Sequence, residues 1–314
     1  MDLVSIPENP APAGAIAGRL KASDGVGLRY VRVPPPEGRK GTVCLFQGRA
    51  EFIEKYFETA NDLRARGFAV ALLDWRGQGL SDRPLRNRLK GHVRDFAEYD
   101  RDLEVFMREV VMPDCPPPYF ALAHSMGGSV LLRAAQQNRR WFSRTVLSAP
   151  MIGLPGRNGS GAARVAARWM RRLGAGRAYG PSSKGAPVFT QPFDGNPLTS
   201  DAARYARTRR VLEVNSDLAL GWPTIGWLAA AYDQMDAFAD PSFPLRLRHP
   251  LLIIGAGQDA VVSNSATETF CSRLRAGALV TIPGARHEMM MERDVYRSQF
   301  WAAFDAFVPG SGEA

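Results

Sequence analysis

One serine stands in a pattern that is typical of a nucleophile. Ser125 lies in the run AHSMGG at residues 123–128, between a short apolar run and an amphipathic segment. A sharp turn from a strand into a helix needs small residues two positions before and two after the serine, and Ala123 and Gly127 supply them. The N-terminal N–H groups of the following helix point toward the same hydroxyl. We therefore predict that Ser125 is a nucleophile, with His124 and Gly127 supporting the turn.

A neutral serine hydroxyl needs a base to activate it and an acid to orient that base. The chain has four histidines, at positions 92, 124, 249 and 287. His287 follows the apolar run 279–282 and a Pro-Gly-Ala turn, so it lies in the loop after the last strand of the expected core. We predict that His287 is the base, while a purely structural loop histidine stays open as the alternative.

The orienting acid should follow an earlier strand on the same edge of the sheet. Asp259 is the only carboxylate in the loop 255–262, directly after the apolar run 251–254. The chain order Ser125, Asp259, His287 is the order found in α/β-hydrolases, and it differs from that of other serine-hydrolase folds. We predict that Asp259 orients His287; a capping role at the next helix is the alternative.

Ester or amide hydrolysis also needs two donors for the oxyanion of the tetrahedral intermediate. One is the backbone N–H of the residue after the nucleophile, Met126. We expect the other from the loop after the apolar run 42–46, where Gly48 allows close approach and the N–H of Arg49 is available. Each such donor contributes about 3–4 kcal/mol of transition-state stabilisation.

Short apolar runs that alternate with helical patterns must position these residues. This alternation predicts a doubly wound α/β fold, with a mostly parallel central sheet flanked by helices. The expected strands are 27–33, 42–46, 68–73, 119–123, 144–148, 250–255 and 279–282, and the expected helices are 53–66, 96–111, 126–137 and 294–307.

The alternation is lost in the middle of the chain. Residues 153–245 are rich in Gly, Pro, Arg and aromatic residues, with helical patterns at 162–173, 201–215 and 224–238. We predict a helical cap insertion at 153–245, lying over the ends of the strands, and a core made of residues 1–152 and 246–314.

Composition excludes several classes of protein. The chain has 314 residues, of which 45% are hydrophobic and 23% charged, so it can bury a core and is not a disordered protein. No run of about 18 apolar residues predicts a membrane-spanning helix. Residues 1–17 lack a basic start followed by an apolar stretch, so we expect a cytoplasmic protein. Three distant cysteines without a C-x-x-C pair predict no structural metal site.

The net charge of +9 has two interpretations. An excess of arginine spread through the chain is what a bias toward GC-rich codons produces. Alternatively, a basic amphipathic helix at 164–173 rests on anionic membrane, as a peripheral contact at its inner face. The cluster to examine is Arg164, Arg168, Arg171, Arg172 and Arg177. No nucleic-acid-binding module is recognisable, so we expect no nucleic-acid partner. Nothing indicates an oligomeric state.

Four motifs, in order along the chain, resemble those of the monoacylglycerol lipase/lysophospholipase family of α/β-hydrolases, and its bacterial lysophospholipase-like branch in particular. They are QGRAE at 47–51, DWRGQGLS at 74–81, HSMGG at 124–128 and GARHE at 284–288. The likeness extends over about residues 25–308. The commoner family pattern opens the first motif with His-Gly, whereas this chain has Gln47-Gly48.

The resemblance implies hydrolysis of the carboxylic ester of a single-acyl-chain lipid, a lysophospholipid or a monoacylglycerol, without metal or organic cofactor. It also implies that the cap sets specificity, so Trp222 and Trp227 are candidate substrate-binding residues. Other apolar side chains of the cap could line an acyl tunnel or form the cap's own small core: Trp169, Met170, Phe189, Phe193, Ile225 and Tyr232.

Two other functions stay open. One is an esterase or amidase acting on small or polar substrates. The other is a non-catalytic binding protein on a hydrolase fold, because fold alone does not determine function. A complete set of nucleophile, base and acid favours an enzyme over a binding protein.

Overall fold

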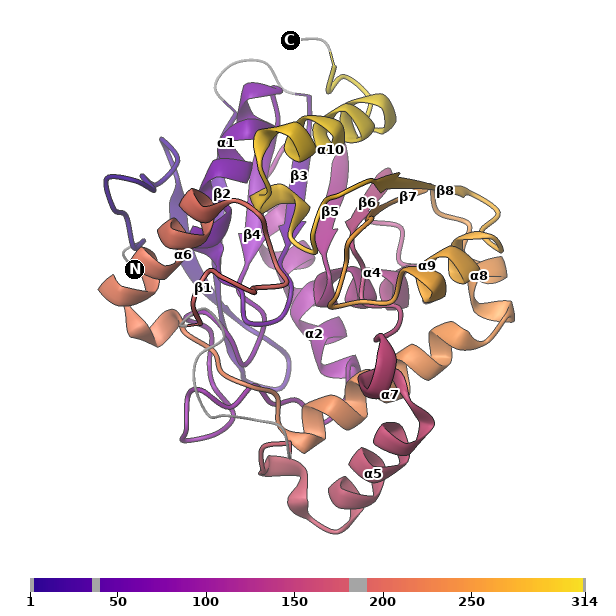
Figure 1. Cartoon of the computed structure of the whole chain (residues 1–314). Helices are drawn as coiled ribbons and strands as arrows, with labels where there is room; N and C mark the ends of the chain where they lie inside the picture. The colour runs from indigo at the N-terminus through magenta and orange to yellow at the C-terminus, as the bar shows by residue number, and fades with distance from the viewer. Residues whose placement is uncertain (1–2, 36–39, 181–190, 313–314) are drawn as a thin grey trace.

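Eight strands form one sheet in the order β1-β2-β4-β3-β5-β6-β7-β8 (Figure 1). The structure is a computed structural model, and it describes residues 3–35, 40–180 and 191–312. The strands are β1 (Ile16–Lys21), β2 (Gly27–Val33), β3 (Thr42–Phe46), β4 (Ala69–Leu73), β5 (Tyr119–His124), β6 (Arg144–Ser148), β7 (Leu251–Ala256) and β8 (Gly277–Ile282). β2 pairs antiparallel with β1 and with β4, and the other neighbouring strands are parallel. The predicted mostly parallel sheet is confirmed.

The central strands are apolar runs because helices cover both faces of the sheet. Every residue of β3, β4 and β7 is buried, as expected for parallel strands packed on both sides. β1 was not predicted from the sequence. Its sequence IAGRLK lies at the edge of the sheet, and only one of its six residues is fully buried, so it lacks the strong apolar pattern of an inner strand.

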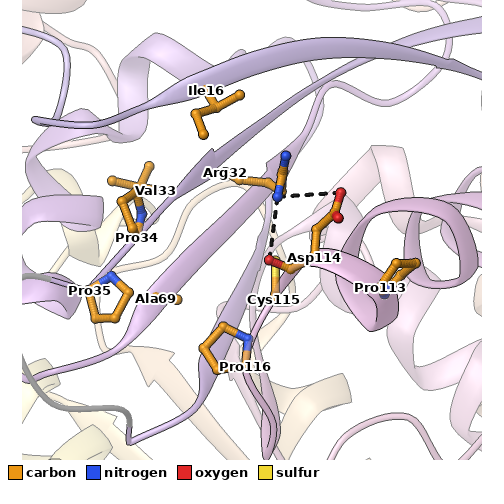
Figure 2. A pocket seen from close by; sticks show the side chains of 10 residues that line it. All are labelled: Ile16, Arg32, Val33, Pro34, Pro35, Ala69, Pro113, Asp114, Cys115 and Pro116. Carbon is orange, nitrogen blue, oxygen red and sulfur yellow. Dashed lines mark hydrogen bonds and ion pairs between the residues drawn. The ribbon is translucent and has the colours of Figure 1, made fainter.

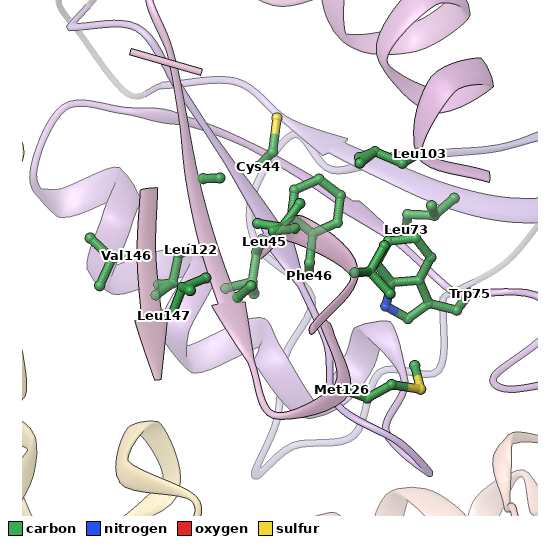
Figure 3. Close-up of a cluster of buried hydrophobic side chains, with 14 of the residues drawn as sticks. Cys44, Leu45, Phe46, Leu73, Trp75, Leu103, Leu122, Met126, Val146 and Leu147 are labelled. Carbon is green, nitrogen blue, oxygen red and sulfur yellow. The ribbon is translucent and has the colours of Figure 1, made fainter. Parts of the chain in front are cut away.

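The core under the predicted site is aromatic and tightly packed (Figure 3). Phe46 at the end of β3 stacks on Trp75, with 5.5 Å between ring centroids. The Trp75 indole N–H donates to the carbonyl of Gln47 at 3.0 Å. Cys44 is fully buried, as predicted, and burial raises the pKa of its thiol. The packing of Trp75 therefore fixes the loop that leaves β3.

Helices flank the sheet near the predicted positions. They are α1 (Phe57–Ala65), α2 (Ala97–Phe106), α4 (Met126–Gln136), α9 (Asn264–Cys271) and α10 (Asp294–Phe307). Residues Ile53–Tyr56 form a short 3-10 turn before α1. The helix expected at 96–111 continues through a π-helical turn at Met107–Val111 into α3 (Met112–Asp114). Pro113 lies in the first turn of α3, a position where its missing N–H removes no helical hydrogen bond.

The chain between β6 and β7 is an insertion by topology. β6 and β7 are hydrogen-bonded neighbours, with Thr145 opposite Leu251. Among the described residues of the insertion, none belongs to a strand of the sheet. The insertion holds α5 (Gly161–Arg172), α6 (Ala202–Val214), α7 (Ile225–Ala239) and α8 (Ser242–Arg246), which confirms three predicted helices within one or two residues. In Figure 1, α5 and α7 lie beyond the sheet, at the end of the molecule away from the C-terminus.

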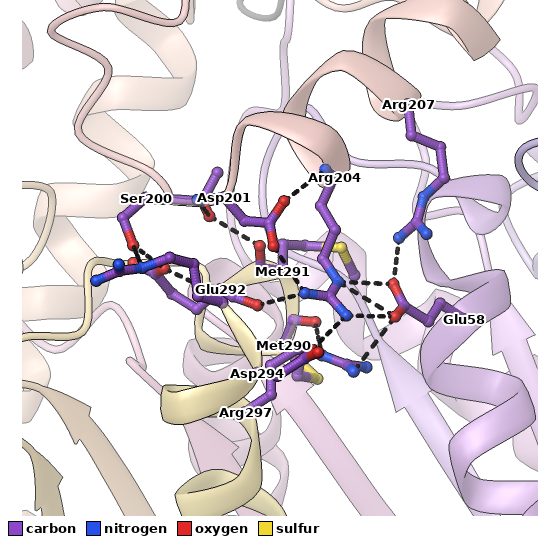
Figure 4. A network of polar contacts seen from close by, with 12 residues as sticks. Glu58, Ser200, Asp201, Arg204, Arg207, Met290, Met291, Glu292, Asp294 and Arg297 are labelled. Atoms are coloured by element: carbon purple, nitrogen blue, oxygen red, sulfur yellow. Dashed lines mark hydrogen bonds and ion pairs between the residues drawn. The ribbon is translucent and has the colours of Figure 1, made fainter.

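An ion-pair network fastens α6 to the core (Figure 4). Arg204 contacts Glu58 of α1 and Asp294 of α10, each at 2.7 Å. Arg207 also pairs with Glu58, and Arg297 lies 3.3 Å from the same carboxylate. Burial raises the pKa of Glu58, but the arginines outweigh it and bring that pKa down to about 2. Helix α6 of the insertion is therefore joined to the core by charge as well as by packing.

Part of the basic side of α5 packs against α7, so only part of the predicted basic cluster is available to a membrane. Arg168 and Arg171 pair with Asp233 of α7 at 2.7 and 2.8 Å. Arg164 and Arg168 both pair with Asp236 of α7. Three of the five arginines in the predicted cluster are thus paired with two aspartates between the two helices. An amphipathic pattern defines two faces of a helix, but it does not tell which face meets the rest of the protein.

Candidate active site

Ser125 lies at a strained turn between β5 and α4. Its φ of 50° and ψ of −114° are unusual for a residue with a side chain. The N–H of Ser125 donates to Ser148 of β6 at 3.0 Å, and its carbonyl accepts from Met151 at 3.0 Å. These bonds from neighbouring segments hold the strained turn in place. Ser125 is buried, with 8% of its surface exposed.

Gly127 is required by packing. A Cβ at this position would lie 2.6 Å from the backbone carbonyl oxygens of both Phe46 and Gln47. Backbone atoms cannot yield as a flexible side chain can, so any larger residue would separate α4 from the end of β3. The small residue predicted after the serine therefore lets the turn approach the loop that carries Gly48 and Arg49.

Asp259 and His287 are in direct contact. The Nδ1 of His287 lies 2.8 Å from Oδ2 of Asp259. The other oxygen of Asp259 accepts the N–H groups of Val261 and Val262 at 2.8 and 2.9 Å. Burial raises the pKa of Asp259, but the hydrogen bond and charge of His287, together with these N–H groups, outweigh burial and lower it. An ionised Asp259 keeps the proton on Nδ1 of His287, which leaves Nε2 free to accept one.

The alternative role of Asp259 as a helix cap is not what the structure shows. Ser263 is the N-cap of α9, and its hydroxyl accepts from the N–H of Ala266 at 3.2 Å. The backbone contacts of Asp259 stay within its own loop, at Val261 and Val262.

His287 lies beside the serine turn without a direct hydrogen bond to it. The ring of His287 packs on that of His124, the residue before Ser125, with 4.7 Å between centroids. Within the described ranges, no hydrogen bond joins the Ser125 hydroxyl to His287. Catalytic hydrogen bonds commonly tighten only when substrate is bound. The structure thus brings together the three predicted residues, and their catalytic roles stay predictions.

The predicted oxyanion loop is held from two sides. The side chain of Gln78 donates to the carbonyl of Gly48 at 2.8 Å, beside the contact from Trp75 to Gln47. Both residues belong to the DWRGQGLS motif, whose structural role could not be deduced from the sequence. The backbone N–H groups of Arg49 and Met126 have no hydrogen-bond partner among the residues that the structure describes. They are therefore free to donate to an oxyanion.

A buried charge network lies beneath these loops, and the sequence did not predict it. Lys55 contacts Glu51 at 2.7 Å and Glu288 at 2.6 Å. Glu51 also accepts from the Tyr56 hydroxyl at 2.7 Å and from the N–H of Gly48. Its Oε2 lies 3.1 Å from Nδ1 of His124. Burial raises the pKa of Glu51, but Lys55 and His124 outweigh it, so that pKa lies well below its usual value.

This network favours the charged form of His124. Its Nδ1 faces the carboxylate of Glu51, and its Nε2 lies 3.3 Å from the backbone carbonyl of His287. Both partners are acceptors, an arrangement that suits the imidazolium because it can donate from both ring nitrogens. Burial lowers the pKa of His124, but the charge of Glu51 more than compensates and raises it. His124 therefore links the serine turn, the oxyanion loop and the loop of His287.

The two predicted substrate-binding tryptophans have different surroundings. Trp227 is buried, donates from its indole N–H to the Tyr99 hydroxyl at 3.2 Å, and carries the Arg49 guanidinium over its ring. Trp222 is 39% exposed. Burial favours a core role for Trp227, and contact of either residue with substrate stays a prediction. Phe189, another candidate for the acyl tunnel, lies outside the described residues.

A separate pocket lies away from these residues (Figure 2). It has a volume of about 400 Å³ and is lined largely by proline and aliphatic residues, beside an ion pair of Arg32 with Asp114 at 3.3 Å. Burial raises the pKa of Cys115 at its wall to about 11, so the thiol is unreactive near neutral pH. In the part of the chain that the structure describes, no group of three His, Cys, Asp or Glu side chains could hold a metal ion.

The sheet order, the strained serine turn and the acid–base pair at the ends of later strands define an α/β-hydrolase. The chain belongs to the family described as serine aminopeptidase, S33 (Hydrolase_4), whose model matches residues 37–294. It is 33% identical to lysophospholipase L2 of Escherichia coli K12 over 288 residues, which is 88% of this chain and 82% of that protein.

Solved structures share the fold. A soluble variant of monoglyceride lipase from Saccharomyces cerevisiae superimposes with a TM-score of 0.73 at 19% identity, covering 95% of this chain and 96% of that one. A carboxyl esterase from Bacillus coagulans superimposes with a TM-score of 0.74 at 18% identity, covering 94% and 98%. The predicted α/β-hydrolase fold and the family resemblance are confirmed.

Proposed function

We propose that the protein is a serine hydrolase that cleaves the carboxylic ester of a lipid with a single acyl chain, a lysophospholipid or a monoacylglycerol. The observation that carries this proposal is the hydrogen-bonded pair of Asp259 and His287 beside the strained turn of Ser125. The similarity to lysophospholipase L2 over most of both chains supports the substrate class.

In this mechanism His287 removes the proton of Ser125 as its Oγ attacks the acyl carbonyl. The resulting oxyanion accepts hydrogen bonds from the N–H groups of Arg49 and Met126. His287, now protonated and held by Asp259, gives its proton to the leaving alcohol. Water activated by the same imidazole then attacks the acyl-enzyme, which releases the fatty acid and restores Ser125.

We further propose that residues 153–245 act as a cap over this site, with 1–152 and 246–314 as the catalytic core. Two observations support this division. The flanking strands β6 and β7 pair directly despite the insertion, and Arg49 of the core lies over the ring of Trp227 of the insertion. A cap in contact with the oxyanion loop is placed to select the substrate.

A panel of esters tests the substrate class. We expect kcat/KM to be highest for lysophospholipids or monoacylglycerols with long acyl chains, and to fall by at least about 10-fold for acetyl esters, because buried methylene groups contribute binding energy. An aminoacyl anilide represents the amidase alternative. Preference for the acetyl ester or the anilide would contradict the lipid assignment and leave the serine mechanism intact.

We also propose that α5 contacts the surface of an anionic membrane through its apolar side. Val165, Trp169 and Leu173 lie one turn apart along the helix, and Trp169 and Leu173 are 58% and 79% exposed. Arg172 and Arg177 are exposed near the same end of the helix. No helix in the described ranges is long and apolar enough to span a bilayer. An apolar stripe beside exposed cations suits a surface contact.

Vesicle sedimentation tests this contact. We expect the double substitution Trp169→Ser and Leu173→Ser to weaken binding to vesicles of anionic phospholipid by about 10- to 100-fold, because two large apolar side chains lose burial in the interface. Val295→Ser is the matched control, because Val295 is 56% exposed on the distant helix α10. Equal binding by the double variant and the wild type would rule out this face.

A further inference from the structure

Arg49 is a half-buried cation without a carboxylate partner among the described residues. Its Nη2 donates to the carbonyl of Gly221, and its guanidinium lies over the ring of Trp227, 5.2 Å from the centroid. Its Nε is buried and makes no hydrogen bond within the described ranges. Burial lowers the pKa of Arg49 to about 10, which still leaves it charged near neutral pH.

Two arginines with buried side chains in the described core, Arg29 and Arg76, are paired with acids. Arg29 contacts Glu54 at 2.6 Å and Asp74 at 2.7 Å. Arg76 contacts Asp102 at 2.7 Å. A guanidinium that is removed from water without a counter-charge lowers the stability of the folded protein. We therefore expect a bound ligand to supply the missing negative charge. Arg49 departs from the pairing of Arg29 and Arg76, and unlike Arg83 it belongs to the proposed oxyanion loop.

The position of Arg49 defines what that ligand can be. Its backbone N–H is the proposed oxyanion donor, so the scissile carbonyl lies next to its main chain. Its side chain extends from there toward Gly91, Gly221 and Trp227, where the cap meets the core. The same number of covalent bonds separates the backbone nitrogen of an arginine from its guanidinium carbon as separates the ester carbon of a 1-acyl glycerophospholipid from its phosphorus.

We propose that the guanidinium of Arg49 binds the phosphodiester of a lysophospholipid whose ester lies at Ser125, so that the enzyme favours lysophospholipids over monoacylglycerols. This inference rests on the proposed lipid-ester hydrolysis. Guanidinium is the preferred partner of phosphate because its planar N–H groups match two oxygens at once. The Trp227 ring would hold the planar group at a fixed tilt, which lowers the entropy lost on binding.

The contact of Arg49 with Gly221 also allows a purely structural role, in which Arg49 only links the core to the cap. Arg83 provides the comparison, because its guanidinium reaches the carbonyls of Asp217 and Ala219 in the same stretch of the cap. Like Arg49, it has a buried Nε without a partner among the described residues. If loss of a link between core and cap were enough to alter substrate selectivity, substitution of Arg83 would alter it as much as substitution of Arg49.

The test compares two substrates that differ by the phosphoglycerol head group: a lysophosphatidylglycerol and a monoacylglycerol with the same short acyl chain, both kept monomeric. We expect Arg49→Met to lower the ratio of their kcat/KM values by about 10- to 100-fold, mainly through a higher KM for the phospholipid, as for loss of a charge-assisted hydrogen bond. Arg49→Lys should restore part of the ratio, and Arg83→Met should leave it unchanged.

Inhibition by inorganic phosphate distinguishes a site for the lipid head group from a site for free anions. The activity is followed with a neutral p-nitrophenyl ester. Inhibition by phosphate together with an unchanged substrate ratio in Arg49→Met would replace the proposal by a free-anion site. An equal loss on both lipids, or an equal fall of the ratio in Arg83→Met, would overturn it in favour of a structural role. If the wild type cleaves neither lipid, the proposed function itself fails.

Discussion

Ser125→Ala is expected to lower kcat for a lysophospholipid ester by about 10⁴- to 10⁶-fold, because no other group can form the acyl-enzyme. The methyl group of alanine fits the same turn, so the folded protein should persist. A fluorophosphonate probe measures the outcome directly, since it labels only an activated serine. The wild type should be labelled and Ser125→Ala should not.

Ser148→Ala is the matched control for this experiment. Ser148 lies on the neighbouring strand β6, and its buried hydroxyl has no hydrogen-bond partner among the described residues. Removing that hydroxyl should leave both labelling and kcat near the wild-type level. Labelling of Ser125→Ala, or a wild type that resists the probe, would contradict the serine mechanism.

Glu51→Gln is expected to have the largest effect on stability. The substitution removes the carboxylate that Lys55 and His124 share, so His124 loses its counter-charge while Lys55 keeps that of Glu288. We expect the free energy of unfolding at pH 7 to fall by about 3–5 kcal/mol. Because Glu51 also accepts the N–H of Gly48, the oxyanion loop should shift, and kcat should fall by about 100-fold or more.

Urea denaturation at several pH values tests the electrostatic origin of this loss. The pKa of Glu51 is lower in the folded protein than the 4.5 of a free glutamate, so its contribution is complete above pH 4.5. As pH falls below that value toward the lowered pKa, Glu51 in the wild type takes up a proton. The difference between wild type and Glu51→Gln should then shrink.

Asp102→Asn provides the comparison for Glu51→Gln. Asp102 forms a buried ion pair with Arg76, away from the site, so its loss should also destabilise the protein. We expect its kcat to change far less than that of Glu51→Gln when both are assayed below their unfolding temperatures. Equal losses of kcat would show that Glu51 acts only through global stability.

Most of the sheet could be predicted because its inner strands are buried on both faces and therefore consist of apolar runs. β1 could not, since an edge strand with Gly, Arg and Lys depends on backbone pairing with β2. The three predicted catalytic residues were located because each must follow a strand of a parallel sheet, where the strand ends converge.

The charge network was beyond prediction for a different reason. Glu51, Lys55 and Glu288 are residue types that are exposed in most proteins, and nothing in one sequence marks an ionic group as buried. Their pairing joins segments from opposite ends of the chain. The ion pairs of α5 were also beyond prediction, since the acids that pair with its arginines lie on α7, far along the sequence.

The insertion between β6 and β7 also sets the order in which the active site is assembled during synthesis. The strand and helix that frame Ser125 leave the ribosome early, whereas Asp259 and His287 follow strands made after the whole insertion. Domains begin to fold from the N-terminal side as they are made. On the proposed mechanism, Ser125 therefore lacks its base until the last strands join the sheet.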